Sequence, residues 1–468
     1  MRRFYRLAAW TLSVLVIALI VGASWLIVSP PALLSVGSGY AAKIVCSNVF
    51  VSGRDAQQVL AEDVQAPGHP LLKLMRQDVD LTEKTVTVHL LGLFAPGYAV
   101  WHEDFGCSGV PDGDFRAAQQ AVSDVAIPKI PPADSAIAWP DGEAVAPDER
   151  FAALLADDTL TGPGMRAIVV VHDGRIVAET YSEGFSATTP LLGWSMTKSV
   201  NAALIGRLMQ VGALSPDMKG LFPEWRGDAR AEITLGDLLA MESGLAFNEN
   251  YGEVTDVTRM LFLEPDMTRF VLSLPLDANP GERFNYSSGT AVLLSRIWMG
   301  VLGGRSQALS FPARALFMPL GMASAVMEVD ETGIFAGSSY LYATARDWAR
   351  FSLLLLNDGV WKGDRLLPDG FVAAMATPTK ASNGTYSRMQ TWLRGPGPKT
   401  DAEHGLPADT FWLRGHDGQS ATIIPSRKLA VIRLGLTPSK LGYQPQPLIR
   451  RILDLIEAGD LQAGQAPT

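Results

Sequence analysis

A serine and a lysine three residues apart are the first side chains whose types and spacing could do chemistry. Ser195 and Lys198 open an apolar-periodic segment, 195–210, that predicts a helix ending before Gly212. Positions i and i+3 share a helix face, and a helix N-terminus favours a developing anion. A serine hydroxyl becomes a good nucleophile when a neighbouring base takes its proton, and a desolvated lysine can be that base. The ordinary alternative is a serine N-cap with a solvent-facing lysine.

Two later glycine-flanked motifs bring further polar side chains. The segment 280–289 reads PGERFNYSSG and places Tyr286 and Ser288 directly before an apolar helical pattern. The segment 415–420 reads GHDGQS and places His416 at the entry of a C-terminal hairpin. Considered singly, Tyr286 could be a half-buried core tyrosine and His416 a turn histidine.

Taken together and in this order, the three motifs resemble those of the serine β-lactamase and penicillin-binding-protein superfamily. That set is S-x-x-K, a Ser/Tyr-x-Asn element and K-T-G. The class C-like branch, which includes esterases, D-aminopeptidase-like enzymes and 6-aminohexanoate-dimer hydrolases, is the closest likeness because Tyr286 opens the second motif. The stretches 233–245 (ITLGDLLAMESGL) and 343–351 (ATARDWARF) agree with it, and the resemblance covers about residues 148–456.

The resemblance implies an acyl-enzyme mechanism on Ser195. Lys198 would help to deprotonate Ser195, and Tyr286 would pass a proton to the leaving group and later activate water. Backbone N–H groups of Ser195 and Gln419 would form the oxyanion hole. The resemblance therefore makes the chain a serine hydrolase of the esterase or amidase type.

Two positions depart from the family pattern. The second motif ends in Ser288, where β-lactamases have an Asn whose amide holds the acylamino group of a β-lactam. The third has His416 in the position of the family's Lys, while Gly418 keeps the Gly position, where substrate approaches the strand edge. A mostly neutral His beside Asp417 binds a substrate carboxylate poorly compared with a fixed ammonium. Both changes favour uncharged esters or amides.

Strand-like runs at both ends of this region predict the sheet that positions the motifs. Residues 167–172 and 175–180 flank Asp-Gly, the strongest short hairpin signal, and 421–424 and 429–436 predict a second hairpin. Helical patterns lie between them, at 195–210, 235–241, 290–299 and 346–356. This order predicts an α+β fold (an α/β sandwich), in which an antiparallel sheet from both termini of the catalytic unit packs against a helical subdomain.

The N-terminal end predicts a membrane anchor. Residues 7–28 are 22 residues without a charge, long enough as a helix to span about 33 Å. Arginines precede this segment, and no positive charge follows before Lys43, so the N-terminus should stay in the cytoplasm and the rest should be extracytoplasmic, in a periplasm where there is one. A cleaved signal peptide ending near Ala23 is the alternative.

Residues 30–147 have their own pattern. Segments 43–52 and 85–90 alternate as strands, 114–125 resembles a short helix, and a proline-rich linker follows. The two cysteines, Cys46 and Cys107, could form a disulfide in an exported chain or remain separate buried thiols. The predicted organisation is an anchor (1–29), a small extracytoplasmic region with the linker (30–147), the hydrolase domain (148–458) and a flexible tail (459–468).

Composition excludes other classes of function. A net charge of −9 without a basic patch argues against nucleic-acid binding. Neither a zinc-protease motif nor a G-x-G-x-x-G or P-loop motif is present, so we expect no metal and no organic cofactor. His404, His416 and Asp417 could be combined into a ligand set, but they fit surface or turn positions better. The sequence thus predicts a membrane-anchored, exported serine hydrolase acting on a small or peptide-like ester or amide. The alternative from another class is a catalytically idle penicillin-binding-like domain that binds a peptide or envelope partner.

Overall fold

The hydrolase region is built on one five-stranded antiparallel sheet. The computed structural model of the chain describes residues 2–123 and 125–463. The strand order is β12-β13-β14-β5-β6, so the last strands of the region lie beside the first. Both predicted hairpins are confirmed, and β14 joins them by pairing with β5. The strands are β5 (Met165–His172), β6 (Arg175–Tyr181), β12 (Phe411–Arg414), β13 (Ser420–Ile424) and β14 (Leu429–Gly435).

Helices cover both faces of this sheet, because its strands alternate between two apolar sides. Along β5, Val169 and Val171 belong to the main hydrophobic cluster, whereas Ile168 and Val170 face a second cluster. Helix α14 (Ala345–Leu356) packs on the first side, and α5 (Ala152–Leu155) and α16 (Gln446–Ala463) pack on the second. Helix α16 continues into the segment predicted as a flexible tail, and residues 464–468 lie outside the described residues.

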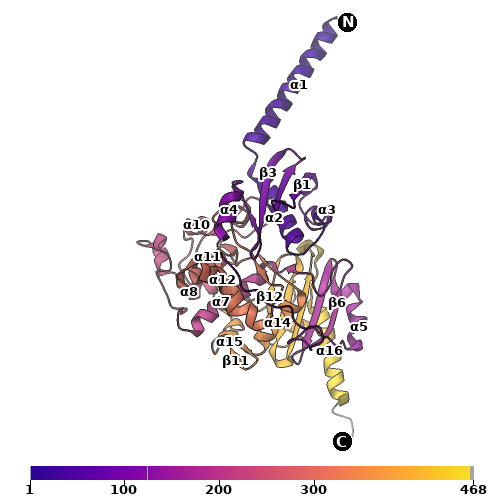
Figure 1. Cartoon of the computed structure of the whole chain (residues 1–468), viewed down its shortest axis with the longest axis vertical. Helices are drawn as coiled ribbons and strands as arrows, with labels where there is room; N and C mark the ends of the chain where they lie inside the picture. The colour runs from indigo at the N-terminus through magenta and orange to yellow at the C-terminus, as the bar shows by residue number, and fades with distance from the viewer. Residues whose placement is uncertain (1, 124, 464–468) are drawn as a thin grey trace.

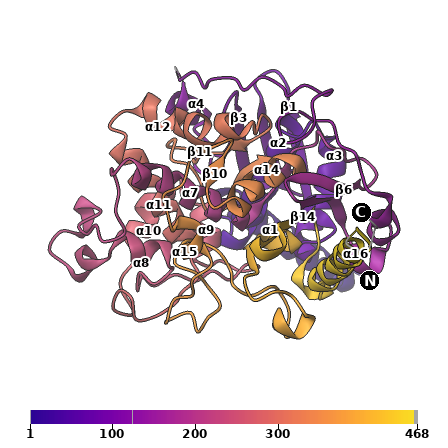
Figure 2. The ribbon, with the colours of Figure 1, turned by 90° about the horizontal axis from the view of Figure 1, so that it is seen from below.

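A helical subdomain lies beside the sheet, as the sequence predicts (Figures 1 and 2). Its long helices α7 and α11 contact each other at the centre of this subdomain. The helices are α7 (Thr197–Gln210), α8 (Leu235–Leu239), α9 (Asp256–Phe262), α10 (Met267–Leu272), α11 (Ser288–Val301), α12 (Arg305–Pro312), α13 (Met318–Leu320) and α15 (Phe371–Met375). A three-stranded sheet of order β7-β9-β8 and a two-stranded sheet of β10 and β11 complete it. These strands are β7 (Leu191–Leu192), β8 (Val326–Met327), β9 (Leu341–Ala343), β10 (Val360–Trp361) and β11 (Asp364–Arg365).

The N-terminal region forms a layer of its own on top of the hydrolase unit. Helix α2 crosses a four-stranded antiparallel sheet of order β1-β2-β3-β4. The predicted strand at 85–90 is confirmed, but the strand at 43–52 is wrong, because most of that segment belongs to α2 and is buried on several sides. Short apolar runs do not distinguish a buried helix from a strand. The elements are α2 (Ala32–Phe50), α3 (Ala56–Val59), β1 (Met75–Asp80), β2 (Thr85–Leu90), β3 (Phe94–His102), β4 (Gly106–Gly109) and α4 (Phe115–Val122).

Buried polar contacts join this layer to the hydrolase unit. Lys43 of α2 forms an ion pair with Glu328, and both side chains are almost fully buried. Ser47 Oγ and the Cys107 backbone N–H donate to Glu328 Oε1 at 2.8 and 2.7 Å. Cys46 and Cys107 form a disulfide that links α2 to β4. The layer is therefore integrated with the hydrolase unit.

The proline-rich stretch after α4 is irregular, as expected of a linker, but it is fixed to the hydrolase unit. The Arg350 guanidinium donates to the backbone oxygens of Pro140 and Gly142, and Arg350 and Arg346 both form ion pairs with Glu143. This segment follows the surface of the folded unit.

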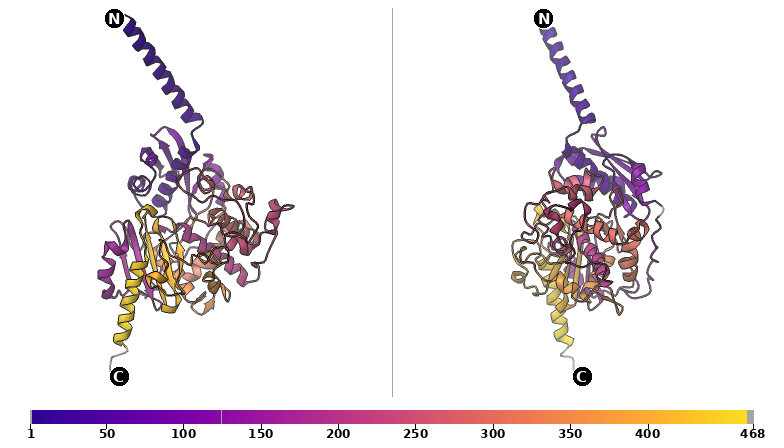
Figure 3. Two further views of the ribbon diagram at one scale, coloured as in Figure 1. Left: turned by 180° about the vertical axis from the view of Figure 1, so that it is seen from behind. Right: turned by 90° about the vertical axis from the view of Figure 1, so that its left-hand side faces the viewer.

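Helix α1 (Arg2–Val28) projects from the body beyond α2 (Figures 1 and 3). Most of its apolar side chains are exposed, up to 83% at Val28. Two helices are long and apolar enough to cross a membrane, 3–28 and 32–50, but α2 is more than half buried inside the protein. Residues 29–31 separate the two helices, because Pro30 and Pro31 disfavour a continuous helix.

Candidate active site

The candidate nucleophile lies on a tight turn before α7. Ser195 is half-buried in a 3₁₀ turn, Trp194–Met196, that leads into the helix. Trp194 has φ +48°, a left-handed conformation that is uncommon outside glycine and typical of strained functional turns. A Cβ at Gly193 would lie 2.2 Å from the Trp348 ring, so the close approach of this turn to α14 requires glycine. The turn leaves Ser195 accessible at the N-terminal end of α7.

Lys198 is buried and aimed at the serine. Its Nζ lies 2.9 Å from Ser195 Oγ, 3.0 Å from Ser288 Oγ and 3.0 Å from the Ser338 carbonyl oxygen. It also lies 4.8 Å from the centre of the Tyr286 ring. The N-cap alternative with a solvent-facing lysine is therefore wrong. The geometry permits direct proton transfer between Ser195 and Lys198.

Tyr286 is held beside Lys198 by other aromatic rings. Its ring centre is 4.9 Å from that of Trp392 and 5.7 Å from that of Tyr386. The side chain is half-buried. The first and second motifs therefore meet at Lys198, as the resemblance implies.

Glu249 is a site residue that the sequence analysis missed. Its Oε1 accepts from Ser288 Oγ at 2.5 Å, and its Oε2 accepts from the Ser288 backbone N–H at 2.7 Å. Burial raises the pKa of this carboxyl, and the nearby Lys198 opposes that rise. Ser288 thus accepts from Lys198 and donates to Glu249. No motif marks Glu249, which lies in the polar loop between α8 and α9.

The third motif approaches the nucleophile turn from the sheet side. A Cβ at Gly415 would lie 2.2 Å from the Gly193 carbonyl oxygen, so the two backbones are in close contact. His416 is 5.6 Å from the Trp194 ring and 4.8 Å from the Tyr251 ring, centre to centre. His416 Nε2 lies 3.5 Å from Asp417, whose pKa is raised by burial.

Gln419 has a structural role through its side chain. Its Oε1 accepts from the Gly435 backbone N–H at 2.8 Å, and its Nε2 donates to the Gly435 carbonyl oxygen. These two hydrogen bonds to β14 fix the loop that contains Gly418, which has φ +85°. The oxyanion role of its backbone N–H stays a prediction. Within residues 2–123 and 125–463, no cluster of three or more His, Cys, Asp or Glu could hold a metal ion.

Comparisons with known proteins agree with this arrangement. The family Beta-lactamase matches residues 155–440. A 6-aminohexanoate-dimer hydrolase of Paenarthrobacter ureafaciens is 26% identical over 274 residues, which cover 53% of this chain and 69% of that protein.

Solved structures show the same fold. A Bacillus anthracis protein, described as a candidate 6-aminohexanoate-dimer hydrolase, matches with a TM-score of 0.55 at 21% identity, over 75% of this chain and 96% of that one. A penicillin-binding-protein homologue from Caulobacter crescentus matches with a TM-score of 0.51 at 18% identity, over 66% and 97%. With Ser195 and Lys198 paired in this fold, the chain belongs to the β-lactamase family of serine hydrolases.

Proposed function

We propose that the protein hydrolyses an ester or amide bond through an acyl-enzyme on Ser195. The observation that carries this proposal is the 2.9 Å contact between Lys198 Nζ and Ser195 Oγ at an accessible helix N-terminus. Ser195 Oγ attacks the substrate carbonyl carbon while its proton passes to Lys198 Nζ. Tyr286 passes a proton to the departing alcohol or amine, and water then releases the acid.

The polar groups around the reaction centre favour a neutral substrate. Ser288 is engaged by Lys198 and Glu249 and so replaces the Asn amide of β-lactamases with a short hydroxyl. His416 lies beside Asp417 rather than presenting a fixed ammonium. Losing both anchors costs about 2–4.5 kcal/mol, the sum of one neutral and one charged hydrogen bond. Penicillins should therefore be poor substrates.

We also propose that α1 anchors the enzyme in a membrane with the hydrolase unit on the extracytoplasmic side. An exposed helix with 22 consecutive uncharged residues is stable in lipid and unfavourable in water. The arginines at its start favour a cytoplasmic N-terminus. Carbonate-washed membranes should retain the full-length protein, and a mature N-terminus at Ser24 would instead support a cleaved signal peptide.

A fluorophosphonate probe tests the catalytic proposal. It should label the wild type and the Ser186→Ala control, which alters an exposed serine, but not Ser195→Ala. Lys198→Ala and Tyr286→Phe should lose most turnover of nitrophenyl butyrate, and the wild type should hydrolyse nitrocefin weakly. Absence of labelling in the folded wild type would favour an idle peptide- or envelope-binding domain, and efficient nitrocefin hydrolysis would refute the substrate argument.

A further inference from the structure

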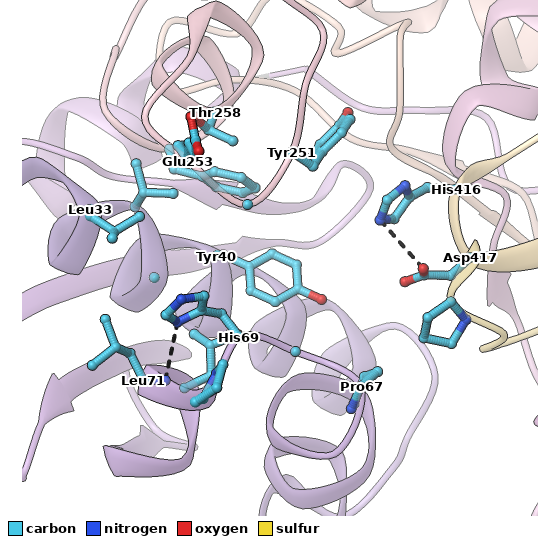
Figure 4. A pocket seen from close by; sticks show the side chains of 18 of the residues that line it. Leu33, Tyr40, Pro67, His69, Leu71, Tyr251, Glu253, Thr258, His416 and Asp417 are labelled. Atoms are coloured by element: carbon cyan, nitrogen blue, oxygen red, sulfur yellow. Dashed lines mark hydrogen bonds and ion pairs between the residues drawn. The ribbon is translucent and has the colours of Figure 1, made fainter. Parts of the chain in front are cut away.

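A cavity of about 510 Å³ lies between the N-terminal layer and the hydrolase unit (Figure 4). Its volume is in the range of about 300–1,000 Å³ that small-molecule sites occupy. We call it the α2 cavity. One wall comes from α2, from the 3₁₀ helix Pro70–Leu74 and from the first residue of β1, and its apolar members are Leu33, Leu34, Val36, Leu71, Leu72 and Met75.

The opposite wall of the α2 cavity is formed by His416 and by residues next to active-site groups. Trp194, which directly precedes Ser195, lines the cavity, and so does His416 of the third motif. Tyr251 also lines it, two residues after Glu249, whose carboxylate accepts from Ser288. The cavity therefore borders the residue before the nucleophile and the third motif, and it extends towards the N-terminal layer.

Charged groups of the lining do not occupy the apolar wall. Glu253 and Lys440 also line the cavity but are exposed to solvent, and Asp417 lies beside His416. Figure 4 shows Tyr40 projecting between the Leu33 side and the His416 side of the space. A flexible hydrocarbon chain matches the apolar wall of this cavity better than a charged group does.

We propose that the α2 cavity binds the hydrocarbon chain of a fatty acyl group whose carbonyl carbon is attacked by Ser195. This proposal rests on the hydrolase function proposed above. It also assigns a role to the N-terminal layer, which supplies one wall of a substrate site. Leu33 and Leu34 lie in the first turn of α2, just after the break that follows α1 (Figure 1), so this wall lies near the end of the body from which the apolar helix projects.

A chain-length series tests the proposal in the full-length protein reconstituted in nanodiscs. The substrates are nitrophenyl esters of C2 to C10 acids, each below its critical micelle concentration. Each methylene that becomes buried raises kcat/KM by up to about four-fold, equivalent to about 0.8 kcal/mol. We expect the wild-type ratio of kcat/KM for C8 over C2 to be at least about 100-fold.

Two leucines on the same 3₁₀ helix make a matched pair. Leu71 lines the α2 cavity, whereas Leu74 does not and is 39% exposed. Leu71→Trp should reduce the C8/C2 ratio by at least about ten-fold. Leu74→Trp should keep the wild-type ratio. Leu34→Trp, from α2, provides a second blocking variant if Leu71→Trp does not fold.

A flat chain-length series in the wild type, or the same C8/C2 ratio in both blocking variants and in the wild type, would overturn the proposal. Turnover of the C2 ester that is lost in Ser195→Ala would still support the hydrolase, so the two proposals can fail separately. Fatty-acid release from phosphatidylcholine vesicles, reduced in Leu71→Trp, would identify a membrane lipid as the source of the acyl chain. A strong C8/C2 ratio without such release would identify a soluble acyl ester.

Discussion

Ser288→Ala tests whether the hydrogen bonds around Lys198 matter for turnover. In the wild type, Lys198 Nζ contacts Ser288 Oγ at 3.0 Å, in addition to Ser195 and the Ser338 carbonyl oxygen. Lys198 is charged once it has taken the Ser195 proton, and removal of one hydrogen bond to a charged group costs about 1.5–3 kcal/mol. If this bond is needed in the transition state, kcat/KM for nitrophenyl butyrate should fall about 10- to 150-fold. Glu249 keeps its bond to the Ser288 backbone N–H, so the loop should stay in place.

The adjacent serine is the matched control. Ser287 Oγ accepts from the Thr290 backbone N–H at 3.0 Å and caps α11. Ser287→Ala should lower the free energy of unfolding by about 0.5–2 kcal/mol and change kcat/KM by less than about two-fold. Urea denaturation and steady-state kinetics of both variants separate the two effects. Equal kinetic losses in the two variants, or no loss in Ser288→Ala, would refute the role given to Ser288.

Three further predictions concern stability. Glu328→Gln leaves the Lys43 ammonium buried without its partner, so the free energy of unfolding in denaturant should fall by about 3–5 kcal/mol. Adding Lys43→Met should recover most of this loss, and no recovery would contradict the pairing. Burial and the neighbouring Asp112 raise the pKa of Glu331 to about 8 from 4.5, so the folded state holds this proton more tightly than the unfolded state. The contribution of Glu331 protonation to stability should therefore be complete below pH 4.5 and lost as the pH rises to 8. Thermal melts across that range should show this loss, and an undiminished pH dependence in Glu331→Gln would contradict it. Reduction of the Cys46–Cys107 disulfide, which joins positions 61 residues apart, should lower the free energy of unfolding in denaturant by about 4 kcal/mol. Identical denaturant curves with and without reductant would show that no bridge is present.

The sequence by itself determined the features that depend on neighbouring residues. The hairpin of β5 and β6 follows from an Asp-Gly pair between two β-rich runs, because the turn and the alternation are both local. The three-residue spacing predicted that Ser195 and Lys198 lie close together where a helix begins, and their side chains are in contact at 2.9 Å, with Ser195 in the 3₁₀ turn just before α7. The resemblance to known motifs then predicted that Tyr286 lies at the same site.

The tertiary structure alone decided what depends on contacts between distant segments. Glu249 reaches Ser288 across 39 residues, and Lys43 reaches Glu328 across 285, and no local pattern encodes either pair. The segment 43–50 was predicted as a strand because a short apolar run can be buried in either conformation, and only its packing in the folded protein shows that it belongs to helix α2. The α2 cavity exists only because α2 packs against the hydrolase unit at α9 and leaves a space that Trp194 lines from the other side.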